Sequence, residues 1–318
     1  MTTPIVVIGG PTAGGKSALA LAVARAFDGV VINADSLQVY RELAILTARP
    51  GAAELAQAPH RLYGVLPAAE ACSAGRWRAL ARAEIDAAAA TGRLPVLVGG
   101  TGLYLRALSH GLAPVPAIPA ELRAAAADRL ARLGPAAFHA ALARRDPVMA
   151  ARLRPGDRQR LLRAWEVVEA TGRSLADWQR APRDAPDGLA IAAFVVAPPR
   201  AALYAACDGR FVRMLAAGAL DEARAIDALG LDPGLPAMKA LGLRELQRHL
   251  RGELTLAAAA AAAQAATRRY AKRQLTWFRH QMPEAHWLGA DASIAQDSQR
   301  IETESFTIIR RFLLTPLG

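Results

Sequence analysis

The fold is decided by the stretch Ile5-Val6-Val7-Ile8-Gly9-Gly10-Pro11-Thr12-Ala13-Gly14-Gly15-Lys16-Ser17. Its first four residues are apolar, a pattern typical of a strand buried on both faces of a parallel sheet. Residues 10–17 match GxxxxGK[ST], and residues 17–27 predict a helix. In that strand–loop–helix context the motif predicts a phosphate-binding loop. Its glycines let backbone N–H groups turn inward, Lys16 adds a positive charge, and Ser17 can bind Mg²⁺.

Three more apolar runs predict strands outward from this stretch, at residues 30–32, 95–98 and 191–196. A helical stretch at residues 73–90 separates the second strand from the third. Strands that alternate with helices indicate a doubly wound α/β sheet. We therefore expect an α/β fold with a parallel sheet core like that of P-loop NTPases, which carries an inserted helical subdomain.

The predicted insertion covers residues 111–188. Prolines at 114, 116 and 119 precede its helical patterns, and prolines at 182 and 186 follow them. Residues 120–185 contain 13 arginines and 8 acids, which makes this segment basic. We expect residues 1–110 and 189–288 to form the catalytic core and residues 111–188 to bind RNA. Residues 289–318 carry no pattern that predicts a structure or a role.

The loop lacks the usual companion of a nucleotide hydrolase. P-loop NTPases hold magnesium with an aspartate at the end of another apolar strand. Here the clearest candidate strand ends Val98-Gly99-Gly100-Thr101-Gly102, without a carboxylate. The nearest acid is Asp35, just after the strand at residues 30–32. The loop is therefore expected to bind a diphosphate without serving an NTP hydrolase.

The charge of the chain favours a polyanionic partner. The 318 residues carry a formal net charge of +11, with 53% hydrophobic residues that can bury a full core. However, 36 of the 39 basic residues are arginine, amid much alanine, which is typical of a coding bias. The clustering of arginines is therefore more informative than their number.

Two basic segments stand out as candidate nucleic-acid surfaces. A helix over residues 268–279 would place Arg268, Arg269, Lys272, Arg273, Thr276 and Arg279 on one face, with no acid between 267 and 279. A solvated face normally includes acids that pair at i,i+4. The second cluster is weaker, because an arginine-rich composition scatters such runs. It comprises Arg152, Arg154, Arg158, Arg160 and Arg163.

Other classes of protein are disfavoured. Cys72 and Cys207 have no CxxC spacing and no nearby histidine pair, so neither a cysteine zinc site nor a disulfide framework is expected. The N-terminus has no basic n-region of a signal peptide. The alanine run 257–263 lacks the leucine and isoleucine of a membrane span. We expect a monomeric cytoplasmic protein without a membrane partner.

Beyond the loop, a series of ordered motifs resembles the tRNA dimethylallyltransferase family. The resemblance extends over residues 5–280 and is highly specific as a set. The motifs are Ile32-Asn33-Ala34-Asp35-Ser36-Leu37-Gln38-Val39-Tyr40-Arg41, Thr47-Ala48-Arg49-Pro50, Pro59-His60-Arg61-Leu62, Gly99-Gly100-Thr101-Gly102-Leu103-Tyr104, residues 157–166, Arg210-Phe211, residues 240–245 and residues 272–279. Departures are Leu243 in place of a common tyrosine and Ala206 in place of a frequent arginine, and the latter puts a secondary diphosphate contact in doubt. With two cysteines, the zinc-finger extension of the family's eukaryotic members is not expected.

The resemblance implies transfer of a dimethylallyl group from dimethylallyl diphosphate to N6 of the adenosine on the 3′ side of the anticodon. Gly10–Ser17 and Arg210 would hold the diphosphate, with Mg²⁺ at Ser17 as the cofactor. Lys16, Asp35 and Thr101 would be the catalytic residues, and the partner would be the tRNA anticodon stem-loop. The implied tRNA contacts are Asp35, Ser36, Leu37, Gln38, Thr101, Arg123, Gln159, Arg160, Leu161, Leu162, Arg163, Lys239, Arg244, Lys272, Arg273, Gln274, Thr276, Trp277 and Arg279.

Asp35 has two readings. A carboxylate near the N6 hydrogens could accept a proton as the C–N bond forms, and α/β enzymes place such residues just past a strand. An aspartate followed by serine after a strand is equally typical of a turn or a helix cap. The resemblance favours the general base, with Thr101 orienting the adenine or the diphosphate.

Three alternatives remain open. A P-loop kinase would explain the loop but neither the basic helix nor the Gly-Gly-Thr-Gly strand end. An adenylate isopentenyltransferase would perform the same chemistry on a free nucleotide and would need no basic helical insertion. A non-catalytic nucleic-acid-binding protein would have no use for both the loop and Asp35.

Overall fold

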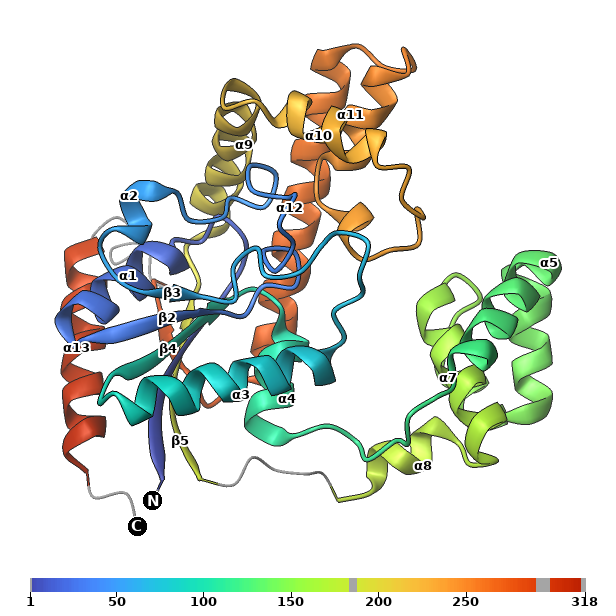
Figure 1. The fold of residues 1–318 in the computed structure, drawn as a ribbon, viewed down its shortest axis with the longest axis horizontal. Coiled ribbons are helices and arrows are strands. Elements are labelled where there is room, and N and C mark those ends of the chain that lie inside the picture. Colours follow the sequence, from blue (N-terminus) through green and yellow to red (C-terminus); the bar gives the residue numbers. More distant parts are fainter. Residues whose placement is uncertain (1, 183–187, 290–297, 316–318) are drawn as a thin grey trace. The chain divides into compact units, whose positions relative to one another are not determined.

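The computed structural model describes residues 2–182, 188–289 and 298–315. They fall into two compact units, Met1–Ser109 with Pro186–Gly318, and His110–Ala185. The first unit contains the sheet and the phosphate-binding loop, whereas the second is helical (Figure 1).

A six-stranded, all-parallel sheet forms the centre of the first unit, in the order β3-β2-β4-β1-β5-β6. The predicted α/β class with a parallel sheet is confirmed, because each strand predicted from an apolar run is present. The two short edge strands were missed, since two or three residues are too few to show a pattern. The bounds are β1 Thr3–Gly9, β2 Gly29–Asn33, β3 His60–Arg61, β4 Leu94–Gly99, β5 Leu189–Val196 and β6 His286–Leu288.

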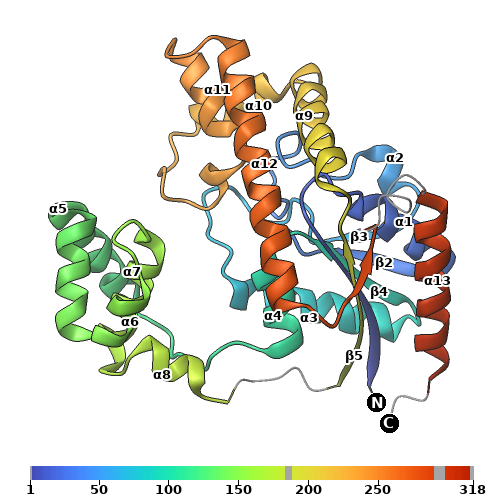
Figure 2. The same cartoon turned by 180° about the vertical axis from the view of Figure 1, so that it is seen from behind.

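Alternate residues of the strands enter two separate cores, one on each face of the sheet. Ile5 and Val7 of β1 lie in the core shared with α3 (Ala74–Ala90), α4 (Gly102–His110) and α12 (Leu256–Gln281). Val6 and Ile8 lie in the core shared with α1 (Lys16–Ala26) and α13 (Ser298–Leu314). Figures 1 and 2 show α13 and α12 on opposite faces of the sheet. The apolar runs of the sequence therefore reflect burial on both faces.

Helix α13 lies in the C-terminal stretch for which the sequence predicted no structure. Ile309 is fully buried, and the ring of Phe306 meets that of Phe27 edge to face at 5.4 Å. This stretch therefore covers one face of the sheet. Its apolar residues Ile301, Ile308, Ile309 and Phe312 recur at helical spacing, so the sequence contained a signal for this helix that was missed.

The remaining helices of the first unit follow the carboxyl ends of the strands. Helix α9 (Arg200–Ala216) follows β5, and a helical group then leads to α12. Besides α12, this group contains α10 (Ala219–Ala228), a short 3₁₀ turn (Ala237–Lys239) and α11 (Leu243–Leu250). The short α2 (Ala52–Leu55) lies between β2 and β3.

The second unit consists of four helices around its own core. Phe138 and Trp165 meet at 5.3 Å in its centre, and both are buried. Gly134, with φ of +73°, interrupts the first helix just before Pro135. The helices are α5 (Ala120–Arg145), α6 (Pro147–Arg152), α7 (Arg158–Thr171) and α8 (Leu175–Arg180).

Candidate active site

The phosphate-binding loop lies between the end of β1 and the start of α1, as the motif predicted. Gly10 has φ of +141°, and a Cβ there would collide with the carbonyl oxygen of Val196 on β5. Gly15 has φ of +90° and directly precedes α1. These two positions explain why the motif requires glycine, because the left-handed region is strained for other residues. Lys16 Nζ donates a hydrogen bond of 2.6 Å to the carbonyl oxygen of Pro11.

A pocket of about 290 Å³ opens over this loop, and most of the predicted catalytic and diphosphate-binding residues line it, whereas Gly10, Pro11 and Thr101 do not. The loop residues Thr12–Ser17 line it together with Asp35 and Arg210. Burial lowers the pKa of Lys16 to about 8; Asp35 opposes this shift and Arg210 adds to it. Burial likewise lowers the pKa of Arg210. Lys16 and Arg210 are two cations in one pocket that contains a single acid among the described residues, so the pocket favours binding of a multiply charged anion.

Arg210 reaches the loop from α9. Its Nη2 donates a hydrogen bond of 2.6 Å to Thr12 Oγ1, so the guanidinium is attached to the loop itself. One turn earlier on the same helix, Ala206 lines the pocket, and Arg213 lines it one turn later. The predicted role of Arg210 in binding a diphosphate therefore fits its position.

Asp35 lies in a turn that closes on its own backbone. Its Oδ1 accepts a hydrogen bond of 2.9 Å from the Leu37 N–H, which is the contact predicted for an aspartate that stabilises a turn. Its Oδ2 makes no hydrogen bond to any residue that the structure describes, and Asp35 lines the pocket. The two readings of Asp35 are thus compatible, because one oxygen holds the turn and the other remains available.

The buried Asn33 fixes this turn, and sequence reasoning missed it. Its side chain accepts the Asp35 N–H at 2.8 Å and donates to the Asp35 carbonyl oxygen at 3.0 Å. The same amide donates to the Leu62 carbonyl oxygen at 3.0 Å. A polar residue at the end of a buried apolar strand was the signal in the sequence that could have indicated this structural role of Asn33.

Thr101, predicted to orient a substrate, joins the ends of two strands. Its Oγ1 accepts the Ser36 N–H at 2.9 Å and lies 3.2 Å from Ser36 Oγ. Its carbonyl oxygen accepts the first N–H groups of α4, from Tyr104 and Leu105. In this structure Thr101 therefore holds the segment that carries Asp35.

The end of β4 explains why no carboxylate follows this strand. β4 pairs with β1, and Gly99 lies opposite Gly9 beside the phosphate-binding loop. A Cβ at Gly99 would collide with the backbone of Ala34. The position where an NTP hydrolase places its magnesium-binding aspartate has no room for a side chain.

Helix α12 packs on this glycine-rich strand end, and Gln274 provides the contact. Gln274 Oε1 accepts the Thr12 N–H at 2.8 Å, and Nε2 donates to the Gly100 carbonyl oxygen at 2.7 Å. The residue is only 6% exposed. The prediction that Gln274 contacts tRNA is therefore wrong for its side chain in this structure. Both of its polar ends are used to join the phosphate-binding loop to β4.

Glu222 holds a second segment near the pocket and gave no signal in the sequence. Its carboxylate, on α10, accepts hydrogen bonds from the backbone N–H groups of Ala44, Ile45 and Leu46. Gln38 Nε2 donates to the carbonyl oxygens of Thr47 and Ala48 at 2.8 and 3.0 Å. Both contacts fix the segment at 44–48, of which Thr47 and Ala48 line the pocket.

The opposite face of α12 carries the predicted basic surface. Arg269, Lys272, Arg273, Thr276 and Arg279 are exposed on it. Arg268, predicted to lie on the same face, is half-buried and forms an ion pair with Asp208 of α9. The acid comes from a neighbouring helix, so the local window could not show it. We call the five exposed residues the basic face of α12.

Comparisons with known proteins identify the family of this chain. The sequence profile of the IPP transferase family matches residues 38–281, and that of the isopentenyl transferase family matches residues 3–71. The chain belongs to the IPP transferase family.

Members of this family are similar along nearly the whole chain. A tRNA dimethylallyltransferase of Rhodospirillum centenum is 62% identical over 285 residues, 89% of this chain and 91% of that relative. The crystal structure of a tRNA isopentenylpyrophosphate transferase from Bacillus halodurans is 31% identical, with a TM-score of 0.69 and coverage of 98% and 97%. A eukaryotic dimethylallyltransferase described as acting on tRNA has the same fold, with a TM-score of 0.83 at 24% identity over 98% of this chain and 80% of that one.

In the helical unit, most of the RNA contacts suggested by the family resemblance are on the surface. Arg123, Gln159 and Arg160 are exposed, and Arg163 lies 3.6 Å from Glu166. Leu161 is fully buried in the unit's core, and Leu162 packs against that core. The prediction that Leu161 contacts tRNA is therefore wrong for its side chain in this structure.

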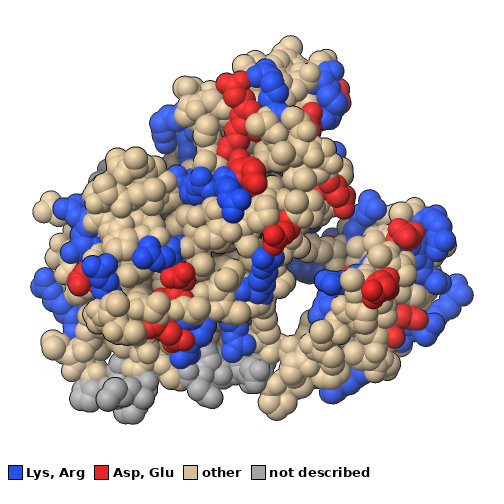
Figure 3. Space-filling model, in the orientation of Figure 1, with Lys and Arg blue, Asp and Glu red and all other residues tan. Residues whose placement is uncertain are grey.

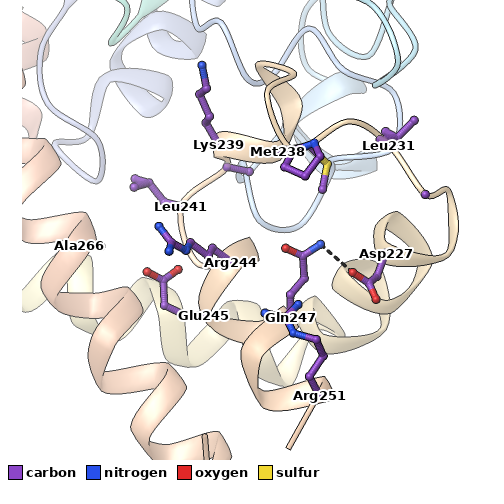
Figure 4. A pocket seen from close by; sticks show the side chains of 13 residues that line it. Asp227, Leu231, Met238, Lys239, Leu241, Arg244, Glu245, Gln247, Arg251 and Ala266 are labelled. Carbon is purple, nitrogen blue, oxygen red and sulfur yellow. Dashed lines mark hydrogen bonds between the residues drawn. The ribbon is translucent and has the colours of Figure 1, made fainter. Parts of the chain in front are cut away.

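Lys239 and Arg244 line a separate pocket of about 740 Å³ between α10, α11 and α12. Figure 4 shows Arg244 beside Glu245, and Gln247 hydrogen-bonded to Asp227 at 3.0 Å. Two acids thus accompany three cations, Lys239, Arg244 and Arg251, in the lining. This pocket is larger than the one over the loop, but the phosphate-binding loop, Asp35 and Arg210 do not line it.

Trp277, the last of the suggested tRNA contacts, is half-buried. Its ring fits against Gly102 so closely that a Cβ at that position would collide with it. The ring also meets Phe278 edge to face at 5.2 Å. These contacts give Trp277 a packing role between α12 and α4 in this structure.

The described residues contain no cluster of three histidine, cysteine or acidic side chains that could hold a metal ion. No helix among them is long and apolar enough to cross a membrane. Basic and acidic side chains are interspersed on the face in Figure 3, so net charge alone marks no single surface there.

Proposed function

We propose that the pocket over the phosphate-binding loop holds dimethylallyl diphosphate and presents its dimethylallyl group to tRNA. As a member of its family the chain is a tRNA prenyltransferase. The acceptor is N6 of the adenosine on the 3′ side of the anticodon, and the product is N6-isopentenyladenosine. The observation that carries this proposal is that the loop, Arg210 and Asp35 share one pocket, beside a strand end without a carboxylate.

Different residues act on the leaving group and on the nucleophile. The C–O bond to the diphosphate breaks as the C–N bond forms, and the departing anion is stabilised by Lys16, Arg210 and the loop N–H groups. The exocyclic amine loses a proton, which Asp35 Oδ2 accepts. An adenine stacked in the anticodon loop must leave the stack to reach this pocket.

Mg²⁺ fits the residues present. The Ser17 side chain lies exposed in the pocket, and its hydroxyl makes no hydrogen bond to the residues that the structure describes. Magnesium is commonly bound by one or two protein groups together with substrate phosphates and water. Ser17 would supply one ligand and the diphosphate others, and the ion would neutralise part of the leaving group's charge.

The tRNA would bind to the basic face of α12 and to the exposed arginines of the helical unit. Asp35, Ser36, Leu37, Gln38 and Thr101 would meet the flipped adenosine at the pocket. Lys239 and Arg244 would contact another part of the stem-loop. We further propose that the protein acts as a monomer in the cytoplasm.

Lys16→Ala tests the assignment of the loop. Prenyl transfer to an anticodon stem-loop should be abolished, because the substitution removes a diphosphate charge. Stem-loop affinity, measured by fluorescence anisotropy, should remain nearly that of wild type. An equal loss of RNA affinity would show that the loop itself binds the RNA, and unimpaired transfer would refute the proposal.

A further inference from the structure

A third pocket lies at the carboxyl end of β5, on the other side of α9 from the loop pocket. Its volume is about 500 Å³, and it is formed by the Ala197–Pro199 turn, the start of α9, α12 and Trp287 of β6. The two pockets are separated by a small apolar cluster of Leu203, Cys207 and Ala271. We call it the β5–α9 pocket.

The lining of the β5–α9 pocket is cationic. Arg200, Lys272 and Arg279 contribute to it, and no acid lines it among the described residues. None of these three cations forms an ion pair within the described part of the chain, and all three are exposed. Unpaired cations around a hollow favour an anionic ligand, since their charge is not neutralised within the protein.

Two aromatic rings line the same pocket. Trp287 is half-buried, and its strand pairing opposite Val195 fixes its backbone beside the Ala197–Pro199 turn. Tyr204 is also half-buried, and the Arg200 guanidinium lies 5.1 Å from the centre of its ring. Aromatic rings can stack on the base of a nucleotide, and the cations beside them can bind its phosphate. The lining of this pocket therefore suits both parts of a nucleotide.

The basic face of α12 leads directly into this pocket. Lys272, Thr276 and Arg279 belong to both, whereas Arg269 and Arg273 continue the face outside it. A strand of RNA whose phosphates follow α12 would therefore place one nucleotide in the pocket. A free mononucleotide would gain nothing from the cations outside the pocket.

We propose that the β5–α9 pocket binds one unpaired nucleotide of the tRNA, with its phosphate at Arg200, Lys272 and Arg279 and its base against Trp287. This inference rests on the proposed function, because it assumes that tRNA is the substrate. It assigns Arg200, Tyr204 and Trp287 to RNA recognition, which no motif in the sequence indicated.

The test compares Arg200→Gln and Trp287→Ala with wild type for binding of an anticodon stem-loop at several salt concentrations. Trp287→Ala should weaken binding roughly tenfold, the scale of one lost base stack. Arg200→Gln should weaken it several-fold and reduce the slope of log affinity against log salt by about 0.7, the value for one single-strand phosphate contact. The KM for dimethylallyl diphosphate should not change in either variant.

Arg224→Gln is the matched control, because it removes an exposed arginine that is paired with Asp221 on α10, away from the pocket. Trp287→Phe keeps an aromatic ring and should retain most of the affinity. Arg200 is exposed, so its variant tests the inference even if Trp287→Ala fails to fold.

Affinities and slopes equal to those of the control would overturn the inference. AMP that binds wild type but not Trp287→Ala, while stem-loop affinity stays constant, would also overturn it and indicate a free-nucleotide site. Prenyl transfer by wild type to the same stem-loop is measured in parallel. Its absence would refute the proposed function, whereas its presence beside unchanged affinities would refute only the subsite.

Discussion

At the scale of single residues, the loop pocket is a site that is electrostatically incomplete without an anion. Lys16 and Arg210 are both partly withdrawn from water, and burial lowers the pKa of each. Asp35 is the one acid that lines the pocket among the described residues. A bound diphosphate would offset the excess positive charge and favour the protonated form of Lys16.

The lowered pKa of Lys16 predicts a pH dependence of diphosphate binding. In the free protein this pKa is about 8, and a bound diphosphate raises it by favouring the charged form. Binding therefore takes up a proton above pH 8, and affinity should fall as pH rises from 8 to 9.5. Calorimetry with inorganic diphosphate over this range, in buffers of different ionisation enthalpy, measures both effects.

The Lys16→Gln variant is the control for this measurement. It should bind diphosphate more weakly throughout and lose the decline above pH 8. A decline of equal steepness in the variant would assign the titration to another group.

Asp35→Asn separates the two roles of this carboxylate. The amide oxygen can still accept the Leu37 N–H, so the turn should persist while the proton acceptor is lost. Turnover should fall by roughly 10²–10⁴-fold, the usual effect of losing a general base, with both substrates still bound. Single-turnover transfer to the stem-loop measures this, and activity within a few-fold of wild type would leave Asp35 with the turn alone.

The sequence predicted the residues that line the loop pocket more successfully than the residues that hold those in position. Thr12–Ser17, Asp35 and Arg210 line one pocket because local sequence determines the loop and the strand ends. Asn33 and Glu222 act through backbone groups of segments distant in sequence, which no local pattern reveals. Gln274 and Leu161 were misjudged because a motif does not show which side of a helix is buried.

At the scale of elements, the two faces of α12 have different surroundings. Gln274 and Phe278 face the glycines at the ends of β4 and β1, while the basic face points to solvent. One side of α12 packs against the phosphate-binding loop and can position it, and the other side is the surface proposed for RNA. Thr12 of the loop contacts both α12 and α9, since Gln274 accepts a hydrogen bond from its N–H and Arg210 donates one to its hydroxyl.

Gln274→Met should therefore impair the donor-substrate site without affecting RNA binding. The Thr12 N–H and the Gly100 carbonyl lose their partners, at a cost of about 1–3 kcal/mol for a buried group left unpaired. We expect a raised KM for dimethylallyl diphosphate and a lowered melting temperature, with stem-loop affinity near that of wild type. Steady-state kinetics and anisotropy measure these quantities.

Thr276→Val is a suitable comparison, because this residue lies on the exposed side of the same helix. It should leave the KM for dimethylallyl diphosphate unchanged. If Gln274→Met instead weakens RNA binding and spares that KM, the assigned orientation of α12 is wrong.

At the scale of the whole molecule, the parallel α/β core followed from the apolar runs and their alternation with helices. Runs buried on both faces of a sheet leave a strong signal, whereas β3 and β6 are too short to leave one. Helix α13 has apolar residues at helical spacing, so its sequence did carry a signal, but its packing on one face of the sheet could not be read from that signal. Long-range packing determines where these elements lie.

The central claim is that the phosphate-binding loop activates a prenyl diphosphate for transfer to tRNA and does not hydrolyse nucleotides. The most direct measurement assays one purified preparation three ways: prenyl transfer to an anticodon stem-loop, prenyl transfer to AMP, and ATP or GTP hydrolysis with and without the stem-loop. The strand end at Gly99 has no room for a magnesium-binding carboxylate, so hydrolysis should be negligible. The stem-loop should be prenylated, and AMP should be a far poorer acceptor. RNA-stimulated ATP turnover without prenyl transfer would contradict the claim, and AMP prenylated as fast as the stem-loop would indicate a free-nucleotide enzyme instead.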